Sequence, residues 1–395
     1  MRIAVTHPTA WPEVRRGSER LLHDLSHRLA ARGHRVTVVT SAPGTRARSE
    51  REGAVERLIL PRRNPPSPIA GRWFNGFHLF GLDLARLLAT EGFEAVHCLN
   101  YHDAAGALAA RRAGARFRLV FQCTGIPVRR YFRRIPLDGL LFRQAVRRSD
   151  AVAVLSHFAK EALARDYGVA GHLLPSPTET APFEIDVPAP AEPRILFTGD
   201  ADEPRKGALL LARAFPAIAE RLPGARLIYS GKAGDAVRAG IAEALPESLR
   251  GRVEILGVGR VEDLPALYAG ATVCVNPAIW EALGNVLIEA LAAGTPVVGA
   301  RHGGIPDIVS EGRTGFLFDP GSVRGAAVNV AGLADAVVRA AELAGHPQTR
   351  AACRAQARSF GWDALAGAYE GLIAGPAPAA AAVGALASGR GIPAR

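Results

Sequence analysis

Short apolar runs alternate with longer stretches of helical periodicity from residue 2 to residue 173. Between residues 18 and 31, four leucines recur at spacings that place them on one helix face, and Gly33 then favours a helix end. Such alternation predicts a mostly parallel sheet with helices on both faces. The expected strands are 2–6, 36–40, 95–99, 118–122 and 151–155, and the expected helices are 18–31, 104–112 and one after Ser156.

A proline-rich segment, residues 174–193, interrupts this alternation. Its six prolines are incompatible with an inner strand or a helix, so it is predicted to be a linker. The alternation then resumes, which predicts a second doubly wound α/β domain. Two such domains would leave a cleft between them, and open sheets bind ligands at the carboxyl ends of their strands. The expected strands of the second domain are 194–198, 225–230, 253–256, 271–276 and 296–299.

The formal net charge of +11 suits nucleic acid, an anionic membrane surface or a phosphorylated substrate. Arginine supplies nearly all of the positive charge, because Lys160, Lys206 and Lys232 are the only lysines in the sequence. This skew is typical of a biased codon composition, so the charge alone selects none of the three partners.

Two features bear on where the protein works. The four cysteines are scattered and form no CxxC pair, which is typical of small apolar side chains in a reducing compartment. The chain begins directly with a strand-like segment and contains no strongly apolar run of about 20 residues, so we expect neither a signal peptide nor a spanning helix. The expected location is cytoplasmic, with peripheral contact at the inner membrane face as an alternative.

The most informative segment is residues 276–315, NPAIWEALGNVLIEALAAGTPVVGARHGGIPDIVSEGRTG. A helix is expected over 285–292, and the free backbone amides of residues 282–284 at its N-terminus would form an anion site. Glu281 and Glu289 flank that site and suit the hydroxyls of a sugar and a ribose on either side of a diphosphate. The structural alternative is that Glu281 offsets the helix dipole and Glu289 lies on a solvated face.

This segment resembles the signature of the family-4 retaining glycosyltransferases, which have the GT-B fold. The likeness rests on EALGNVLIEALAAGTPVV, HGGIPDIV and TGFL with their spacing, and a weaker likeness extends over nearly the whole chain. It implies that Glu281 holds hydroxyls of the donor sugar and that Glu289 holds the ribose. It also implies that the backbone of Leu283, Gly284 and Asn285 binds the sugar and the diphosphate.

The resemblance also implies a domain plan of two Rossmann-like domains facing a central cleft. Residues 1–185 would bind the acceptor, and residues 186–360 would bind the nucleotide sugar. A last helix, residues 361–373, would return to the first domain. Residues 374–395, rich in Ala, Gly and Pro, are expected to form a flexible tail.

A second basic site follows the expected strand 194–198. Arg205 and Lys206 stand there before a helix that opens near Gly207, where a leaving diphosphate needs fixed positive charge. A solvated surface pair is the structural alternative. The family usually has an Arg where this chain has Ala201, whereas here Arg205 directly precedes Lys206.

The same loop contains Asp200–Ala201–Asp202, a DxD pattern. That pattern is found in metal-binding glycosyltransferases of another fold, but acids before a helix commonly cap it. Because two Rossmann-like domains argue against that other fold, no metal is expected.

Weaker matches to the family complete the candidate site. Gly17, before the first long helix, would approach the donor phosphates, and Gly257 with Val258 matches the loop that contacts the base. On the acceptor side, His102 belongs to a segment like the one near the family's acceptor. Thr124 stands where the family commonly has a His.

Residues 129–134, RRYFRR, form a basic run with aromatic side chains. Such a run could bind an anionic lipid, a phosphorylated acceptor or nucleic acid, or it could be a solvated surface of an arginine-rich chain. Family members that act on lipid-linked acceptors often carry a surface of this kind.

Together these features predict a retaining glycosyltransferase that moves a hexose-type sugar from a UDP or GDP sugar to an acceptor hydroxyl. The acceptor would be a glycan, a glycolipid precursor or a natural product, and no cofactor beyond the nucleotide-sugar co-substrate is expected. The alternatives are a nucleotide-sugar epimerase of the same fold and a basic nucleic-acid- or membrane-binding module without catalysis. The sequence has no GxSxG elbow and no P-loop, which argues against an α/β hydrolase and a P-loop NTPase.

Overall fold

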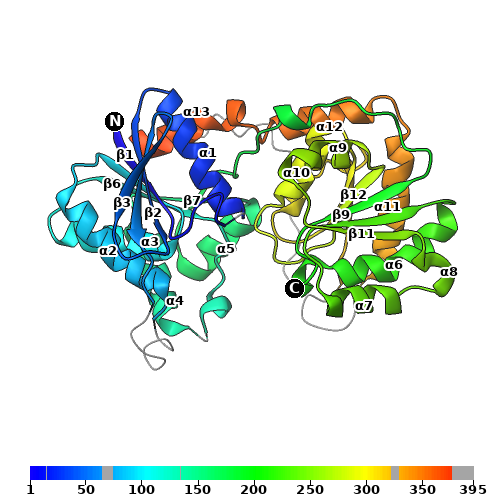
Figure 1. Ribbon diagram of the computed structural model, residues 1–395, viewed down its shortest axis with the longest axis horizontal. Helices are drawn as coiled ribbons and strands as arrows, with labels where there is room; N and C mark the ends of the chain where they lie inside the picture. Colours follow the sequence, from blue (N-terminus) through cyan, green and yellow to red (C-terminus); the bar gives the residue numbers. More distant parts are fainter. Residues whose placement is uncertain (15, 65–73, 134, 322–328, 376–395) are drawn as a thin grey trace. The chain divides into compact units, whose positions relative to one another are not determined.

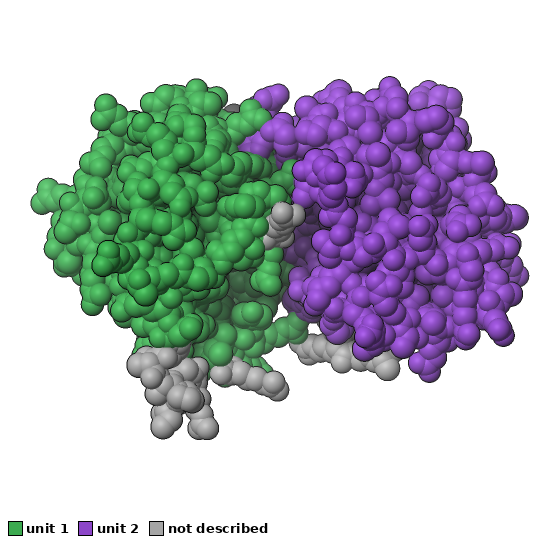
Figure 2. All heavy atoms as spheres, viewed as in Figure 1, with its two compact units in different colours: residues 1–177, 365–383 green, residues 178–364, 384–395 purple. Residues whose placement is uncertain are grey.

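The chain folds into two compact units in a computed structural model that describes residues 1–14, 16–64, 74–133, 135–321 and 329–375. Among the described residues, unit 1 contains residues 1–177 and 365–375, and unit 2 contains residues 178–364 (Figure 2). The division after Pro177 comes earlier than the expected boundary at residue 185. The expected tail lies outside the described residues from residue 376 onward.

Unit 1 is built on a sheet in which, among the described residues, eight strands follow the order β3-β4-β2-β1-β5-β6-β7-β8 (Figure 1). Every pairing is parallel except that of β3 with β4. The strands are β1 (Arg2–Thr6), β2 (Arg35–Ala42), β3 (Arg48–Glu52), β4 (Val55–Pro61), β5 (Ala95–Cys98), β6 (Arg118–Cys123), β7 (Ala151–Val154) and β8 (His172–Leu173). The helices are α1 (Gly17–Ala31), α2 (Gly76–Thr90), α3 (Tyr101–Arg112), α4 (Pro136–Arg148) and α5 (His157–Tyr167), with a 3-10 helix η2 (Arg129–Phe132).

The expected elements of unit 1 are present, and the structure adds β3, β4, β8, α2 and α4, which were not predicted. Strand β3 has the sequence RSERE and is exposed along nearly its whole length, so no apolar alternation marked it. Its charged side chains protect a sheet edge from further pairing. Helix α3 begins at Tyr101, because the Asn100 side chain caps it by accepting from the amide of His102 at 2.9 Å.

Unit 2 is built on a parallel sheet whose described strands follow the order β11-β10-β9-β12-β13-β14 (Figure 1). The strands are β9 (Arg194–Thr198), β10 (Arg226–Ser230), β11 (Val253–Gly257), β12 (Val273–Asn276), β13 (Val297–Ala300) and β14 (Gly315–Phe318). The helices are α6 (Ala208–Arg221), α7 (Asp235–Glu243), α8 (Glu247–Arg250), α9 (Leu264–Ala269), α10 (Asn285–Ala292), α11 (Val330–Ala344) and α12 (Thr349–Arg358). The 3-10 helices are η3 (Ala181–Phe183), η4 (Pro204–Lys206), η5 (Val261–Asp263) and η6 (Ile305–Asp307).

The strand order of unit 2 creates a topological switch point between β9 and β12. The chain runs outward from β9 through β10 to β11 and then crosses to β12 on the other side of β9. The loops that leave β9 and β12 therefore diverge above adjacent strands, the place where doubly wound sheets bind ligands. Both chemistry-bearing segments of unit 2 follow these strands.

The last helix, α13 (Trp362–Ala374), begins in unit 2 and ends in unit 1. Tyr369 is fully buried, and its hydroxyl donates to the carbonyl of Pro175 at 3.1 Å. The Glu370 carboxylate pairs with Arg32 and lies 3.0 Å from His34 Nε2. The segment predicted to complete the first domain is therefore part of its core. None of the described helices is both long enough and apolar enough to cross a membrane.

Candidate functional site

Two loops of unit 2 pack against each other at the switch point. The backbone amide of Ile279, after β12, donates to the carbonyl of Arg205, after β9, at 2.9 Å. Gly207 has a φ of +74°, and a Cβ there would lie 3.0 Å from the carbonyl oxygen of Pro277. This close approach requires glycine and brings the basic turn of η4 beside the loop that precedes α10.

Glu281 joins the two basic side chains of this turn. Its Oε2 lies 2.6 Å from Lys206 Nζ and 3.2 Å from Arg205 Nη1, and Arg205 Nη2 lies 2.7 Å from Glu203 Oε2. The Glu281 and Lys206 side chains are 15% and 20% exposed, whereas Arg205 is 41% exposed. The predicted residues from two distant segments thus form one ionic cluster, with Lys206 as its inner cation.

The segment that follows β13 packs against the loop before α10 and holds that loop in place. His302 Nδ1 accepts from the amide of Trp280 at 3.1 Å, and Gly304 donates its amide to the Glu281 carbonyl at 2.9 Å. A Cβ at Gly303 would lie 2.2 Å from that same carbonyl oxygen. The glycine pair after His302 is therefore a packing requirement for the Glu281 loop.

Gly284 stands at the N-cap of α10 with a φ of +113°, a conformation that favours glycine. Asn285 and Val286 follow in the first turn, where backbone amides have no helical partner and the helix dipole is positive. Leu283 is buried beneath this turn. The geometry is that of an anion-binding helix start next to the Glu281–Lys206 pair.

Glu289 lies inside α10 and is only 7% exposed, so the interpretation of a solvated glutamate is wrong. Its Oε2 accepts from the Tyr268 hydroxyl at 2.9 Å, and that hydroxyl lies 3.0 Å from Thr198 Oγ1. Burial and the Glu289 charge raise the pKa of Tyr268 well above its usual value, so the phenol stays protonated. Tyr268 was not predicted from the sequence, because a tyrosine in an apolar helix is typical of a core residue.

The DxD acids are engaged in contacts within their loop. Asp202 accepts from the amide of Gly234 at 2.7 Å and lies 3.0 Å from Lys232 Nζ. Asp200 accepts from the amide of Asp202 at 3.0 Å. These contacts tie the loop after β9 to the loop after β10.

The predicted base-contacting residues lie at the end of β11. Gly257 has a φ of +76°, and its carbonyl accepts from the amide of Gly231 at 2.8 Å. Val258 is 77% exposed. An apolar side chain this exposed beside the carboxyl edge of the sheet offers a face on which a flat ring can pack.

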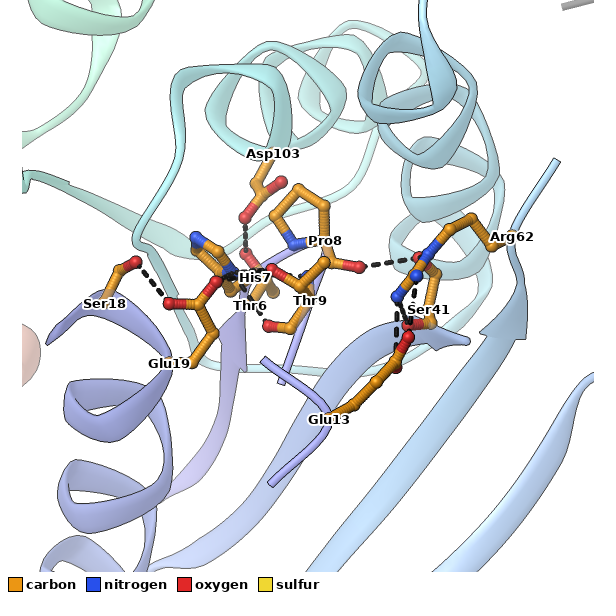
Figure 3. A network of polar contacts seen from close by, with 10 residues as sticks. All are labelled: Thr6, His7, Pro8, Thr9, Glu13, Ser18, Glu19, Ser41, Arg62 and Asp103. Carbon is orange, nitrogen blue, oxygen red and sulfur yellow. Dashed lines mark hydrogen bonds and ion pairs between the residues drawn. The ribbon is translucent and has the colours of Figure 1, made fainter. Parts of the chain in front are cut away.

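Unit 1 contains a buried polar network in the loop between β1 and α1 that the sequence analysis missed (Figure 3). Glu19 is 3% exposed and accepts from Thr9 Oγ1 at 2.7 Å and from Ser18 Oγ at 2.8 Å. His7 lies 3.9 Å from the same carboxylate, and burial lowers its pKa. In the sequence, the polar residues directly after an apolar strand could have indicated this network. The predicted Gly17 is exposed at the start of α1, beside this network.

Further contacts anchor this loop to the sheet of unit 1 (Figure 3). Ser41 Oγ donates to the Pro8 carbonyl at 2.6 Å, and Arg62 pairs with Glu13 at 2.8 Å. Thr6 donates to Asp103 at 3.1 Å; burial raises the pKa of Asp103 well above its usual value, which favours a neutral carboxyl group.

The predicted acceptor-side residues lie in unit 1. His102 is 3% exposed in the first turn of α3. Thr124 is half-buried after β6. In the basic run, Arg130 is exposed and Tyr131 is 67% exposed, whereas Phe132 is buried; residue 134 lies outside the described part of the chain.

Comparison with sequence families covers both units. Residues 15–181 match the family described as Glycosyltransferase Family 4, and residues 192–342 match the family described as Glycosyl transferases group 1. The chain belongs to the family-4 glycosyltransferases.

Curated relatives match this chain over part of their length. A GDP-mannose-dependent alpha-(1-6)-phosphatidylinositol monomannoside mannosyltransferase of Mycolicibacterium smegmatis is 31% identical over 53% of this chain and 59% of its own. A D-inositol 3-phosphate glycosyltransferase of Streptomyces scabiei is 35% identical over 44% of this chain and 39% of its own. The alignments thus span less than two thirds of each relative.

Solved structures of similar fold cover nearly the whole chain. A sucrose-phosphate synthase from Thermosynechococcus elongatus has a TM-score of 0.76 at 22% identity and covers 92% of this chain and 96% of its own. Anabaena HepE in complex with UDP has a TM-score of 0.68 at 18% identity over 94% and 98% of the two chains. The expected fold class, two parallel-sheet α/β domains of the GT-B type, is confirmed.

Proposed function

We propose that this protein transfers a hexose-type sugar, with retention of configuration, from a nucleoside-diphosphate sugar to an acceptor hydroxyl. The observation that carries the proposal is the arrangement around α10. Glu281, paired with Lys206, precedes the helix start, and Glu289 lies buried behind it against Tyr268. Two carboxylates on either side of an anion-binding helix start match the hydroxyl–diphosphate–hydroxyl pattern of a sugar nucleotide.

Each group has a role in the proposed donor complex. Glu289 binds the ribose hydroxyls, and the amides at the start of α10 bind the diphosphate. Lys206 and Arg205 turn from Glu281 to the diphosphate, which frees the Glu281 carboxylate for hydroxyls of the donor sugar. Lys206 and Arg205 stay paired with an anion throughout, because the diphosphate takes the place of the Glu281 carboxylate beside them.

In the transfer step, the acceptor oxygen forms a bond to the anomeric carbon on the face from which the diphosphate departs. The carbon–oxygen bond to the diphosphate breaks, and its electron pair stays on the leaving group. The acceptor proton passes to a phosphate oxygen. Lys206, Arg205 and the helix start stabilise the charge that develops there, so this proposal needs neither a metal nor a further cofactor.

The donor base and the acceptor are proposed from the relatives' names and from unit 1. One relative is named as GDP-mannose-dependent, and one solved structure holds UDP, so the base is guanine or uracil. Two relatives are named for phosphatidylinositol and inositol phosphate acceptors. The exposed Arg129, Arg130 and Tyr131 of unit 1 fit a phosphorylated acceptor or an anionic membrane that presents it.

Calorimetric titration of UDP, GDP and ADP tests the donor site in the wild type and in Lys206→Ala and Glu289→Gln. One nucleotide should bind, and each substitution should weaken it by about 1–3 kcal/mol. Lys160→Ala, at an exposed lysine of unit 1, is the matched control and should bind as the wild type does. Equal affinity in all four proteins would refute the donor-site assignment.

Product analysis tests the reaction itself. NMR of the glycoside formed from the preferred donor should show the anomeric configuration of the donor. Inversion would contradict the retaining mechanism, and conversion of the donor into another sugar nucleotide would identify an epimerase.

A further inference from the structure

Three polar side chains converge where α2, α3 and α4 begin in unit 1. His78 is the third residue of α2, His102 the second of α3 and Asp138 the third of α4. The Nε2 atoms of His78 and His102 lie 2.8 and 3.3 Å from the same oxygen, Asp138 Oδ1. The three side chains are 7%, 3% and 10% exposed. Because α3 and α4 follow the adjacent strands β5 and β6, the cluster lies at the carboxyl edge of the sheet.

The other nitrogen of each ring faces an asparagine. His102 Nδ1 lies 2.8 Å from Asn100 Oδ1, and His78 Nδ1 lies 2.9 Å from Asn75 Oδ1. Both oxygens also accept backbone amides, which identifies them as the oxygens of the side-chain amides. The Nδ1 of His102 therefore carries a proton. At His78, the Asn75 amide donates to Nδ1 at 3.2 Å while Asn75 Oδ1 lies 2.9 Å from the same nitrogen, so the contacts define the tautomer of His102 and not that of His78.

At His102, this arrangement directs an unshared electron pair at an anion. In a neutral ring with hydrogen on Nδ1, Nε2 is an acceptor, and here it faces a carboxylate oxygen. Within the described part of the chain, His78 Nε2, His102 Nε2 and Asp138 Oδ1 are buried and have no hydrogen-bond partner beyond their approach to one another. The positive ends of three helices favour the ionised carboxylate of Asp138. A positive group placed between these three buried, electron-rich atoms would therefore stabilise them.

We propose that His78, His102 and Asp138 bind a divalent cation of the zinc type through the two Nε2 atoms and one carboxylate oxygen. The candidate ligand atoms all lie within 4.8 Å of one another. A tetrahedral ion with bonds of about 2.0 Å needs ligand atoms about 3.3 Å apart. A histidine that binds a metal through one ring nitrogen usually donates a hydrogen bond from the other. Here the Nδ1 atoms face the asparagine oxygens in the positions that such hydrogen-bond partners take.

The site is distinct from the proposed donor chemistry, which lies in unit 2, and stands independently of it. The Tyr101 ring lies 4.2 Å from the His102 ring, and its hydroxyl forms a hydrogen bond with the Asp138 carboxylate. A bound ion would connect the starts of three helices and leave a fourth coordination position for water or an oxygen of a ligand.

A second histidine cluster provides a matched control. His23 and His27 lie one turn apart on α1, with Nε2 atoms 3.2 and 3.9 Å from Glu52 Oε1. These side chains are 34%, 35% and 44% exposed, so water reaches them more readily than it reaches the buried cluster.

Metal binding is measured on full-length protein carrying no histidine tag, by elemental analysis after dialysis and by titration with Zn²⁺ and with Co²⁺ as a spectroscopic probe. The variants are His78→Gln, His102→Gln, Asp138→Asn and the double variant His23→Gln/His27→Gln. We expect one equivalent bound by the wild type and by the double variant, with a visible cobalt spectrum of low coordination number. The three buried-cluster variants should lose that equivalent while circular dichroism shows that they remain folded.

Two results would overturn the proposal. Failure of the wild type to bind either metal would mean that protons fill the space between the rings and the carboxylate. Loss of binding in the double variant, with retention in Asp138→Asn, would place the metal at α1. If the buried-cluster variants fail to fold, X-ray absorption of the zinc-loaded double variant decides the matter, because it must show two imidazole ligands.

Discussion

At the residue scale, burial turns ordinary side chains into defined chemical groups. Glu289 and Tyr268 belong to helices that read as apolar, yet their contact is a buried hydrogen bond of 2.9 Å that fixes one carboxylate oxygen. Tyr229 offers a comparison in the same unit, since its buried hydroxyl donates to the Ala208 carbonyl at 2.9 Å. The two tyrosines differ in their acceptors: Tyr268 holds Glu289, the proposed ribose ligand, whereas Tyr229 holds only a backbone carbonyl.

Tyr268→Phe should therefore weaken nucleotide binding as well as stability. Loss of the hydroxyl leaves Glu289 and Thr198 without this partner, which should cost about 1–3 kcal/mol of folding free energy. It should also reduce nucleotide affinity several-fold, as measured by calorimetry. Tyr229→Phe should lose similar stability and keep its affinity. Equal affinities in the two variants would show that Tyr268 does not position Glu289.

His97 gives a prediction on pH dependence. It is completely buried, and burial lowers its pKa to about 3. Between pH 6.5 and 3, the unfolded chain binds a proton that the folded chain does not, so stability falls as the pH falls through 6.5. By this linkage, His97 should remove about 2 kcal/mol of stability between pH 7.5 and pH 5.

Urea unfolding of wild type and His97→Phe at both pH values measures this effect. The difference between the two pH values should be about 2 kcal/mol smaller in the variant. His157→Phe, at an exposed histidine of unit 1, should keep the wild-type difference. The same pH dependence in His97→Phe as in wild type would contradict the prediction.

At the scale of elements, close backbone approach sets the shape of the candidate donor site. The segment after β13 lies directly beneath the loop before α10, and a Cβ at Gly304 would lie 2.4 Å from the Ala282 carbonyl oxygen. The nearest atoms to such a Cβ all belong to the backbone of Ala282 and Leu283, so no flexible side chain could move aside to make room for it.

Gly304→Ala should therefore displace the loop that carries Glu281. We expect nucleotide affinity to fall at least about tenfold, or about 1.4 kcal/mol, with α/β secondary structure retained. Gly251→Ala is the control, because a Cβ at Gly251 would meet no atom within 4 Å. Calorimetry with the preferred nucleotide compares the two. Wild-type affinity in Gly304→Ala would show that the loop adapts.

At the scale of the whole molecule, the chain is divided into two units, and α13 belongs to both. Its second half places Tyr369, Leu372 and Ile373 in the core of unit 1, far along the sequence from the rest of that core. The charged residues of the candidate donor site, by contrast, all lie in unit 2, whereas the predicted Gly17 lies in unit 1. Stability of unit 1 and nucleotide binding should therefore be separable.

Tyr369→Ala tests this separation. Loss of a fully buried aromatic ring should destabilise unit 1 by about 3–5 kcal/mol. Hydrogen exchange should show the loss in β5, β6 and α1, while calorimetry should show unchanged nucleotide affinity. Loss of nucleotide binding at a temperature where unit 2 remains folded would show that nucleotide affinity depends on unit 1.

The sequence by itself determined the features that depend on neighbours along the chain. Periodicity identified most strands and set the bounds of α10 at residues 285–292, because apolar alternation and glycine conformation are local properties. The segment around Glu281 and Glu289 also gave the family and the fold, because its motif is contiguous. The exposed strand β3 was not predicted, because it has no apolar alternation.

Only the tertiary structure decided which distant residues meet. The pairing of Lys206 with Glu281 follows from the adjacency of β9 and β12, and that of Glu289 with Tyr268 from the packing of α9 near α10. His78, His102 and Asp138 converge because three helices begin at one edge of a sheet. No residue spacing in the sequence predicts these contacts, because strand order and helix packing depend on how the whole core is buried.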